Sequence, residues 1–456
     1  MSCLNIAFMT LGCKVNYYET QRLSAEFERA GANVVSFESA ADIYVVNTCT
    51  VTNIADRKSR KMLHRARRLN ENALVVAMGC FAEANKESAA DMEGIDVVIG
   101  NDRKNDAYGI IMGKYLDLST GENVGTMAQE SLHTSDSPGT AGLNTYPENG
   151  RTRAYVKIQD GCNQFCSYCK IPYVRGKLKS RVDKDVIDEV KCLADSGCRE
   201  IVLTGIHLSS YGVDRSECKS FVELGGKPVA GLASELAELA GIERIRFGSL
   251  EPRIITEEFV KDISRNSKVC PHFHLSLQSG CDKTLAAMNR KYTVDDYRKA
   301  CGILRKYYDR PAVTTDIIVG FPGETDGDFE QSVRFVKEIG FSNIHVFKYS
   351  KRDGTRAAQM ECSVSESVKH DRSSRLIDAG REMTEIYNRS FIGQKQLCLV
   401  EERITAGGRE YFTGHNERYI KLIFDAYGIS EDMQNELVEV VPSEIFDGGM
   451  LFCERI

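Results

Sequence analysis

The most restrictive feature of this sequence is a regular alternation of short apolar runs with helix-length stretches. Before residue 119 the apolar runs are 6–10, 43–47 and 74–78, and the helical patterns are 17–30, 55–69 and 82–92. Such alternation indicates βα units, because neighbouring parallel strands need a long crossover between them. The sequence therefore predicts an α/β fold that begins with an open parallel-sheet domain over residues 1–118.

Each of these three units carries a cysteine just after its strand. Cys13 lies in FMTLGCKVN, Cys49 in IYVVNTCTV and Cys80 in LVVAMGCFA. The carboxyl ends of parallel strands share one edge of the sheet, so three thiols could converge there. Converged thiolates could hold zinc with a water, or a 4Fe–4S cluster with one open iron. Three unconnected buried cysteines are the remaining alternative.

The cellular setting bears on how the 16 cysteines are used. The first ten residues, MSCLNIAFMT, lack the basic and apolar regions of a signal peptide, and no stretch approaches the ~20 apolar residues of a membrane span. We expect a cytoplasmic protein with no membrane partner. In that compartment clustered cysteines more often bind metal or take part in catalysis than form disulfides.

A second group of cysteines follows a predicted linker. Residues 119–150 contain no Lys or Arg, are rich in Ser, Thr, Gly and Asn, and show no apolar period. Beyond them, GCNQFCSYCKIPYVRGK places Cys162, Cys166 and Cys169 in C-x3-C-x2-C spacing. Three thiolates at this spacing can bind three irons of a cubane and leave the fourth iron open. Zinc more often uses two paired C-x2-C arms, and no second pair lies nearby.

Residues 151–387 contain six further strand-like runs with helix-length stretches between them. These runs are 155–158, 200–204, 244–249, 274–278, 315–319 and 344–349. They predict a barrel of βα units, in which functional groups collect at the C-terminal ends of the strands. After about residue 388, strand-like runs at 396–400, 419–423 and 437–441 alternate with glycines and predict a small all-β domain.

The motifs together resemble the radical S-adenosylmethionine (SAM) methylthiotransferase family over nearly the whole chain. They are the two cysteine groups with TLGCKVNYYETQRL, CNQFCSYCKIPYVRGKLKSR, LTGIHLSSYG, LSLQSG, MNRKYT and TTDIIVGFPGET. The resemblance implies a partial (βα)6 radical-SAM barrel over residues 151–387 and an RNA-binding β-barrel of the TRAM type over residues 388–456. It also implies SAM and two 4Fe–4S clusters, one on each cysteine group.

The resemblance also implies site residues and partners. Tyr168 would contact the adenine of SAM, and Gly205, Gln278 and Asp316 would complete the SAM site. The cysteines would be cluster ligands, and no side chain would act as a catalytic acid or base. The implied partners are tRNA, through its anticodon stem-loop, a low-potential electron donor such as flavodoxin or ferredoxin, and a sulfur donor.

The stretches TLGCKVN, PYVRG and MNRKYT are most similar to the branch that acts on N6-threonylcarbamoyladenosine beside the tRNA anticodon. That branch inserts a methylthio group at carbon 2 of the adenine. Sister branches modify isopentenyladenosine in tRNA or an aspartate of a ribosomal protein. A different class also fits the residues, namely a two-cluster electron carrier or a redox-sensing RNA-binding protein.

Basic residues point to several RNA contacts. The helix predicted after Cys49 carries seven, namely Arg57, Lys58, Arg60, Lys61, Arg65, Arg67 and Arg68. Such a run is usually a solvated face, but beside a thiol edge it can also contact a phosphate backbone. We expect further contacts from Arg175 and Arg181, and from Arg418 and Lys421. The last two lie in residues 388–456, where twelve acidic and seven basic residues give a net charge of −5.

Overall fold

The computed structural model describes residues 4–86, 92, 94–120, 152–361, 364–429 and 432–456. It divides into two compact units. Unit 1 comprises Met1–Thr145, Asp160–Cys192 and Ser350–Ala358, and unit 2 comprises Tyr146–Gln159, Leu193–Tyr349 and Gln359–Ile456. The predicted linker at 119–150 lies outside the described residues except for the backbone of 119 and 120, which ends a helix. The domain boundaries drawn from the sequence remain predictions.

Unit 1 contains a five-stranded sheet in which every neighbouring pair is parallel, in the order β2-β1-β3-β4-β5. The strands are β1 (Asn5–Thr10), β2 (Asn33–Val35), β3 (Ile43–Thr48), β4 (Leu74–Gly79) and β5 (Val97–Ile99). The predicted open parallel sheet is confirmed. The sequence did not show β2 and β5, because three residues are too few to establish an apolar period.

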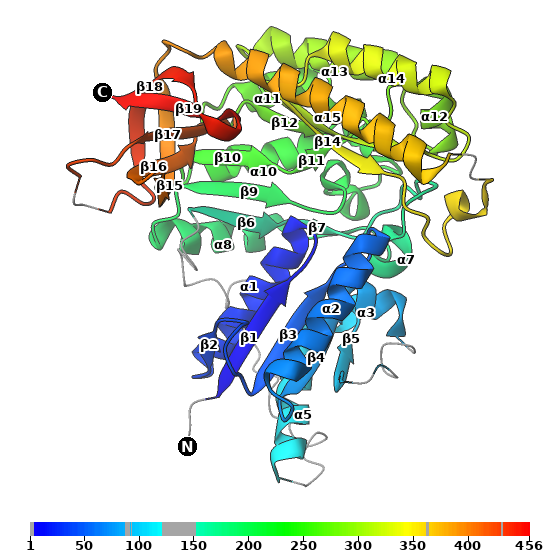
Figure 1. Ribbon diagram of the computed structural model, residues 1–456, viewed down its shortest axis with the longest axis vertical. Coiled ribbons are helices and arrows are strands. Elements are labelled where there is room, and N and C mark those ends of the chain that lie inside the picture. Colours follow the sequence, from blue (N-terminus) through cyan, green and yellow to red (C-terminus); the bar gives the residue numbers. More distant parts are fainter. Residues whose placement is uncertain (1–3, 87–91, 93, 121–151, 362–363, 430–431) are drawn as a thin grey trace. The chain divides into compact units, whose positions relative to one another are not determined.

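Helices cover both faces of this sheet (Figure 1). The helical elements that lie wholly within unit 1 are α1 (Lys14–Arg29), α2 (Asn53–Leu69), α3 (Cys80–Ala84), η1 (Asn101–Asp106), α5 (Ala107–Thr120) and α7 (Ile171–Arg175). Phe27 of α1 and Ile111 of α5 pack on one face with Val45, and Leu63 of α2 packs on the other with Val46. Neighbouring strand residues therefore enter opposite cores, which explains why β3 and β4 are apolar throughout.

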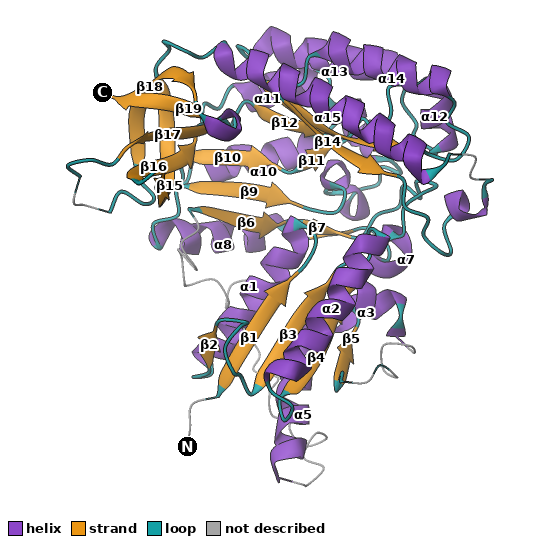
Figure 2. Ribbon diagram, in the orientation of Figure 1, coloured by secondary structure: helices purple, strands orange, loops and turns teal. Residues whose placement is uncertain are grey.

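Unit 2 contains the six βα strands that the sequence predicted, in two parallel sheets (Figure 2). One has the order β10-β9-β6 and the other β11-β12-β13-β14. The strands are β6 (Arg153–Lys157), β9 (Glu200–Thr204), β10 (Arg244–Phe247), β11 (Ser249–Leu250), β12 (His272–Leu275), β13 (Ala312–Val319) and β14 (Asn343–Lys348). Only Gly248 separates β10 from β11, so one chain segment serves both sheets.

The segments between these strands are mostly helical. The elements between and after these strands are β7 (Gln159–Asp160), β8 (Lys179–Ser180), α8 (Asp183–Asp195), η3 (Leu208–Ser210), η4 (Val213–Arg215), α9 (Phe221–Leu224), α10 (Lys227–Ala237), η5 (Pro252–Ile254), α11 (Glu257–Ser264), α12 (Asp282–Ala287), α13 (Val294–Tyr307), α14 (Asp326–Ile339), η6 (Arg356–Gln359) and α15 (Glu366–Arg389). Of these, β8 and most of α8 and η6 belong to unit 1. No helix of the described residues is both long enough and apolar enough to cross a membrane.

The last part of unit 2 is the small all-β domain that the sequence predicted. Its strands close into a barrel in the order β15-β16-β17-β19-β18. They are β15 (Gln396–Ala406), β16 (Arg409–His415), β17 (Lys421–Asp425), β18 (Leu437–Ile445) and β19 (Leu451–Arg455), with η7 (Asp447–Gly449) before the last. Val400, Phe412, Leu422 and Val440 fill its interior.

A buried carboxylate anchors this β-barrel to the βα strands. Glu200 on β9 accepts a hydrogen bond from Nε of Arg246 at 2.9 Å, and Arg244 lies 3.5 Å away. Arg244 also donates to the carbonyl oxygens of Leu397 and His415 in the β-barrel. Burial acts to raise the pKa of Glu200, but nearby guanidinium groups outweigh it and lower that pKa below its ordinary value.

We predict that Glu200→Gln lowers the free energy of unfolding by about 3–5 kcal/mol at neutral pH, because it leaves buried guanidinium groups without their counterion. Because the pKa is depressed in the folded protein, the carboxylate stabilises above the ordinary Glu pKa and loses its effect as the pH falls through the folded value. Denaturant titrations of both proteins should therefore converge at acid pH. The exposed Glu257, paired with Lys306, offers a control, and Glu257→Gln should change stability little.

Candidate functional site

The strand ends of unit 1 bring the three N-terminal cysteines to one edge of the sheet. Cys13 immediately precedes α1, and Cys49 and Cys80 directly follow β3 and β4. The chain continues from β1 to β2 on one side and then to β3 on the other, so the order reverses between β1 and β3. Open parallel sheets bind ligands beyond the strand carboxyl ends at such a switch point.

Gly12 allows the loop after β1 to lie directly against Cys49. Its φ of +101° favours glycine, and an added Cβ would stand 2.8 Å from Cβ and 2.9 Å from Sγ of Cys49. The pKa of Cys49 is raised to about 11, and burial of the thiol is the main cause. The charges of Cys80 and Cys13 also raise this pKa, whereas a backbone hydrogen bond at Val51 lowers it. The thiols of Cys13 and Cys80 are therefore both within electrostatic reach of Cys49.

Among the described residues, no three His, Cys, Asp or Glu side chains are already arranged as ligands of one metal ion. The donor set at this edge nevertheless fits an iron–sulfur cluster, since such clusters take cysteine thiolates as ligands. None of the cysteines that the structure describes is part of a disulfide. A bound metal would deprotonate Cys49 despite its burial, because coordination favours the thiolate.

The second cysteine group also belongs to unit 1. Its loop is closed by hydrogen bonds from the amide of Cys162 to the Gly176 carbonyl at 3.2 Å and from Cys169 to Cys166 at 3.0 Å. Gly161 permits this closure, because a Cβ there would stand 1.9 Å from the carbonyl oxygen of Lys177. The three cysteines are partly exposed, so the loop presents three thiols at its surface.

Arg175, at the end of α7, ties the second cysteine loop to α1. Its side chain is 0% exposed, and it donates to Glu19 at 3.0 Å, Asp160 at 2.9 Å and Asn16 at 2.5 Å. Glu19 is also paired with Lys104 of η1. The buried guanidinium of Arg175 thus has protein partners, and its contact with RNA stays a prediction.

Asn101 makes a second connection between the two cysteine groups. Its Nδ2 donates to the carbonyl oxygen of Val174 in α7 at 2.7 Å and lies 3.7 Å from Sγ of Cys80. Asn101 follows β5, a strand too short to be predicted from the sequence, so the role of Asn101 was not predicted either. The residue is thus placed to orient the thiol of Cys80 relative to the loop that carries the second cysteine group.

A third connection is the segment Ser350–Ala358, which follows β14 in the sequence but packs within unit 1. Arg352 donates to Asp56 at 2.6 Å and to Thr50 at 2.7 Å, beside Cys49. At the other end of the segment, the amide of Ala357 donates to the carbonyl of Ser167 at 2.8 Å. Residues 350–358, the bridging segment, therefore contact the loops of both cysteine groups.

The predicted SAM residues lie at several places. Tyr168 is partly buried in the second cysteine loop of unit 1. In unit 2, Gly205 directly follows β9, and the amide of Gln278 donates to the carbonyl oxygen of Asp316 at 2.9 Å. Asp316 stands in the middle of β13, where its carboxylate lies 3.4 Å from His274. The structure thus brings Gln278 and Asp316 together.

The sequence analysis missed His207, two residues beyond Gly205. Its Nδ1 lies 2.7 Å from Oγ of Ser210, its amide donates to Oε1 of Gln159 at 2.8 Å, and its Nε2 has no hydrogen-bond partner in the described chain. Burial, with two nearby arginines, lowers the pKa of His207 to about 3, so the ring is neutral at neutral pH. Its position at the end of a barrel strand was the available signal.

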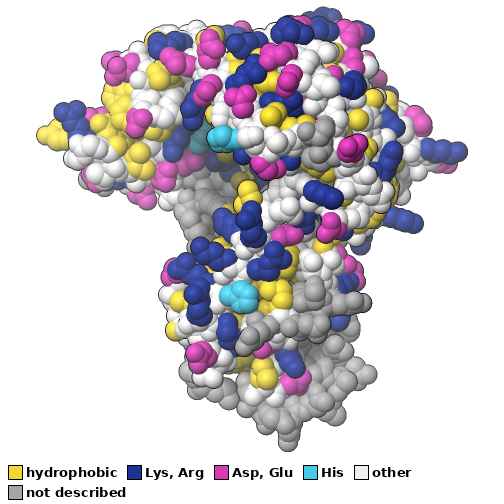
Figure 3. All heavy atoms as spheres, turned by 45° about the vertical axis from the view of Figure 1, so that its right-hand side comes forward, with side chains coloured by type: hydrophobic (Ala, Val, Ile, Leu, Met, Phe, Trp, Pro, Cys, Tyr) yellow, Lys and Arg dark blue, Asp and Glu magenta, His cyan; other side chains and the backbone are white. Residues whose placement is uncertain are grey.

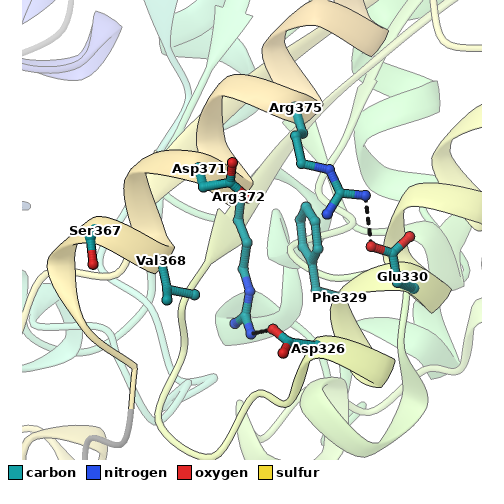
Figure 4. Close-up of a pocket in the computed structure, with 8 residues that line it drawn as sticks. All are labelled: Asp326, Phe329, Glu330, Ser367, Val368, Asp371, Arg372 and Arg375. Carbon is teal, nitrogen blue, oxygen red and sulfur yellow. Dashed lines mark hydrogen bonds and ion pairs between the residues drawn. The ribbon is translucent and has the colours of Figure 1, made fainter.

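A surface pocket of unit 2 lies elsewhere, between α14 and α15 (Figure 4). Ion pairs join Arg372 to Asp326 and Arg375 to Glu330, each at 2.6 Å, across this pocket. None of the predicted SAM or cluster residues lines it. The pocket is therefore a feature of the outer helices and gives no support to the predicted site.

The basic residues of α2 differ in how they are used. Arg57, Lys58, Arg60, Lys61 and Arg68 are exposed. Arg65 is paired with Glu38, and Arg67 with Asp96 at 2.5 Å. In Figure 3, several Lys and Arg side chains lie close together in the lower half of the view. The exposed residues of α2 remain candidates for RNA contact.

The other basic residues predicted to contact RNA are less available. Arg181 is paired with buried Glu189 at 2.6 Å. Arg418 donates to the carbonyl oxygens of Asp309 and Arg310, so it helps to join the β-barrel to the rest of unit 2. Lys421 is partly exposed, 3.5 Å from Glu402. Arg181 and Arg418 thus have structural partners that the sequence could not reveal.

Comparison with known proteins agrees with this arrangement. Residues 156–336 match the radical SAM superfamily, and residues 5–100 match the uncharacterized protein family UPF0004. The threonylcarbamoyladenosine tRNA methylthiotransferase MtaB of Bacillus subtilis is 38% identical over 95% of this chain and 93% of its own length. The chain belongs to the radical-SAM methylthiotransferase family. Membership makes it an enzyme, and the alternative of an electron carrier or sensor no longer stands.

Two further relatives and one solved structure extend the comparison. MtaB of Aquifex aeolicus is 36% identical over 88% of this chain and 93% of its length. The tRNA-2-methylthio-N(6)-dimethylallyladenosine synthase of Syntrophus aciditrophicus is 35% identical over 99% of this chain and 95% of its own length. The radical SAM methyltransferase TsrM of Kitasatospora setae, solved with tryptophan and a SAM analogue, has a TM-score of 0.52 at 16% identity, covering 75% of this chain and 72% of TsrM, and shares the fold alone.

Family membership implies one 4Fe–4S cluster and SAM for this methylthiotransferase. The C-x3-C-x2-C loop matches the motif expected to hold that cluster. The bridging segment then has a clear structural role, since it joins this loop to the loop of Cys49. Because Arg352 is buried and paired with Asp56, its removal would leave a carboxylate without its counterion.

We predict that Arg352→Met lowers the free energy of unfolding of the anaerobic protein by about 3–5 kcal/mol, because the partly buried Asp56 loses its partner. The double variant with Asp56→Asn should be less destabilised than the sum of the two single variants, since both remove one interaction. Arg356→Met, at an exposed position of the same segment, is the control. Additive effects in denaturant titrations would contradict a coupled pair.

Proposed function

We propose that this enzyme modifies tRNA, inserting a methylthio group at carbon 2 of N6-threonylcarbamoyladenosine beside the anticodon. The observation that carries the proposal is the 38% identity over nearly the full length to a protein named for this substrate. Two more relatives with the same name, at 36% and 33% identity, support it. The relative named for dimethylallyladenosine, at 35%, makes that nucleoside the second candidate.

Each cysteine group would hold a 4Fe–4S cluster. Cys162, Cys166 and Cys169 would leave one iron open for SAM, and Cys13, Cys49 and Cys80 would leave one open for the sulfur to be transferred. When bound, SAM and the cluster beside it would supply a 5′-deoxyadenosyl radical, and the other cluster would supply a methylated sulfur. The proposal rests on the thiol-only donor sets and on the connections from Asn101 and the bridging segment.

The reaction explains why the chain needs no catalytic acid or base. The C–H bond at carbon 2 of adenine is not acidic enough for a side chain to deprotonate at neutral pH, so the hard chemistry falls to the cofactors. The protein would bind and orient them, with Tyr168 at the adenine of SAM and Gly205, Gln278 and Asp316 around the rest. Gln278 and Asp316 are suited to act together, since the backbone joins them.

Other partners follow from the same chemistry. Iron–sulfur potentials extend to roughly −700 mV, so reduction would need a low-potential protein such as flavodoxin or ferredoxin. Each turnover also consumes a sulfur atom, so a sulfur donor must replace it. For tRNA, the exposed residues of α2 would contact phosphates, and an anticodon loop offers bases that are already unpaired.

Anaerobically reconstituted protein should hold about eight irons, as two clusters of four. Replacing Cys13, Cys49 and Cys80 by Ala should halve the iron content and preserve reductive cleavage of SAM, because the second group remains. Replacing Cys162, Cys166 and Cys169 should abolish 5′-deoxyadenosine formation. The control Cys192→Ala/Cys218→Ala should keep all the iron. If the variant without Cys13, Cys49 and Cys80 kept all its iron, the proposal that these cysteines hold a cluster would be wrong.

The substrate is tested by mass spectrometry of nucleosides from tRNA of a strain that lacks the gene. We expect the 2-methylthio derivative of N6-threonylcarbamoyladenosine to disappear and its precursor to accumulate. A plasmid copy should restore the product, whereas a copy with Cys162, Cys166 and Cys169 replaced should not. Loss of the dimethylallyladenosine product instead would reassign the substrate, and unchanged tRNA would contradict the proposal.

A further inference from the structure

Two aromatic side chains beside the second cysteine group are exposed to solvent. Phe165, immediately before Cys166, is 48% exposed, and Tyr173 in α7 is 53% exposed. Their ring centroids are 5.8 Å apart and the ring planes meet at 79°. Large apolar side chains are normally buried, so an exposed aromatic pair next to a predicted cofactor site needs a reason.

The backbone at Phe165 is held in a conformation that aromatic residues rarely adopt. Its φ is +47°, in the left-handed region, where a bulky side chain strains the backbone. Such strain persists only where the surrounding structure imposes it, and it concentrates at functional sites. Here it accompanies an exposed ring in the loop that carries the cysteines. Burial of the ring therefore does not explain the strained conformation.

Unit 1 also exposes other apolar side chains, together with cationic ones. Val51 and Ile54, which follow Cys49, are also exposed, at the start of α2. The bridging segment contacts this start through Arg352 and the second cysteine loop through Ala357. Within the part of the chain that the structure describes, the exposed side chains of Arg57, Lys58 and Lys61 form no ion pair with an acidic residue. Unit 1 thus carries exposed rings and available cations on elements that one segment connects.

We infer that Phe165 and Tyr173 form a stacking site for an unpaired base of an RNA loop. The inference rests on the proposed function, in which the substrate is a tRNA. Proteins that bind unpaired nucleotides combine aromatic faces for the bases with cations for the backbone. Because the two rings are nearly perpendicular, a flat base that stacks on the face of one ring meets the edge of the other, and both rings contact the same base. The site therefore accepts a single base, and α2 holds neighbouring phosphates.

Stacking and phosphate contacts respond differently to salt, and this difference provides the test. Stacking releases no counterions, whereas each phosphate contact contributes about 0.7–0.9 to the slope of log affinity against log salt concentration. Tyr173→Ala should weaken binding of an anticodon stem-loop RNA roughly 5- to 150-fold at unchanged slope. Tyr173→Phe should retain the affinity. Phe165→Leu, which keeps an apolar side chain but removes the ring, should also weaken binding.

A second set of variants reverses the charge of basic side chains and leaves both aromatic rings in place. Arg57→Glu/Lys61→Glu should weaken binding and flatten the salt slope. The control Arg29→Glu/Lys114→Glu makes the same change in charge on α1 and α5, which cover the other face of the sheet, and should alter neither quantity. A blunt-ended RNA duplex should bind wild type and Tyr173→Ala equally, because it offers no unpaired base. Iron analysis of every variant separates lost stacking from a lost cluster.

Each outcome decides between named alternatives. If the wild-type protein does not bind the stem-loop, the tRNA substrate of the proposed function fails. If it binds and both Tyr173→Ala and Phe165→Leu bind equally well, the stacking site is wrong. A loss seen only with Tyr427→Ala, whose ring is 93% exposed in the C-terminal β-barrel, would place the base contact there and also overturn the inference.

Discussion

The buried carboxylate of Glu19 and its two cationic partners hold the cysteine-bearing elements of unit 1 together. Glu19 lies on α1 after Cys13, Arg175 ends α7 after the second cysteine group, and Lys104 belongs to η1 after β5. Burial acts to lower the pKa of Arg175, but the charge of Glu19 raises it well above its ordinary value. A charge in the protein interior is costly without a partner, so each of the three elements keeps the others in place.

This constraint explains how two distant parts of the sequence can serve one reaction. The parallel sheet delivers Cys13, Cys49 and Cys80 to one edge, but it does not determine where the second cysteine loop lies. Arg175, Asn101 and the bridging segment do so, through three sets of polar contacts. In the proposed reaction, transfer of sulfur to a radical on a bound base would require both cofactors to approach the same carbon atom. A rigid connection between their loops meets this requirement better than a flexible one.

The basic residues show where chemistry read from sequence is insufficient. Arg175, Arg181 and Arg418 lie in stretches that look suitable for phosphate contact, yet each is committed to protein partners. Several basic residues of α2 are instead exposed, because consecutive cations on one helix cannot all face the core. A sequence identifies a cation but not its counterion, since partners such as Glu19 lie more than 150 positions from Arg175.

Local patterns along the chain were sufficient to predict the βα alternation, the six barrel strands, the final all-β domain and the two cysteine groups. These features depend on local periodicity and on spacing within one loop, which are properties of neighbouring residues. Only the tertiary structure revealed the short strands β2 and β5, the packing of residues 350–358 in unit 1 and the roles of Arg352, Asn101 and His207. Those features arise from contacts between residues far apart in the chain. No local pattern records such contacts, because their energy comes from burial and charge pairing in the folded molecule.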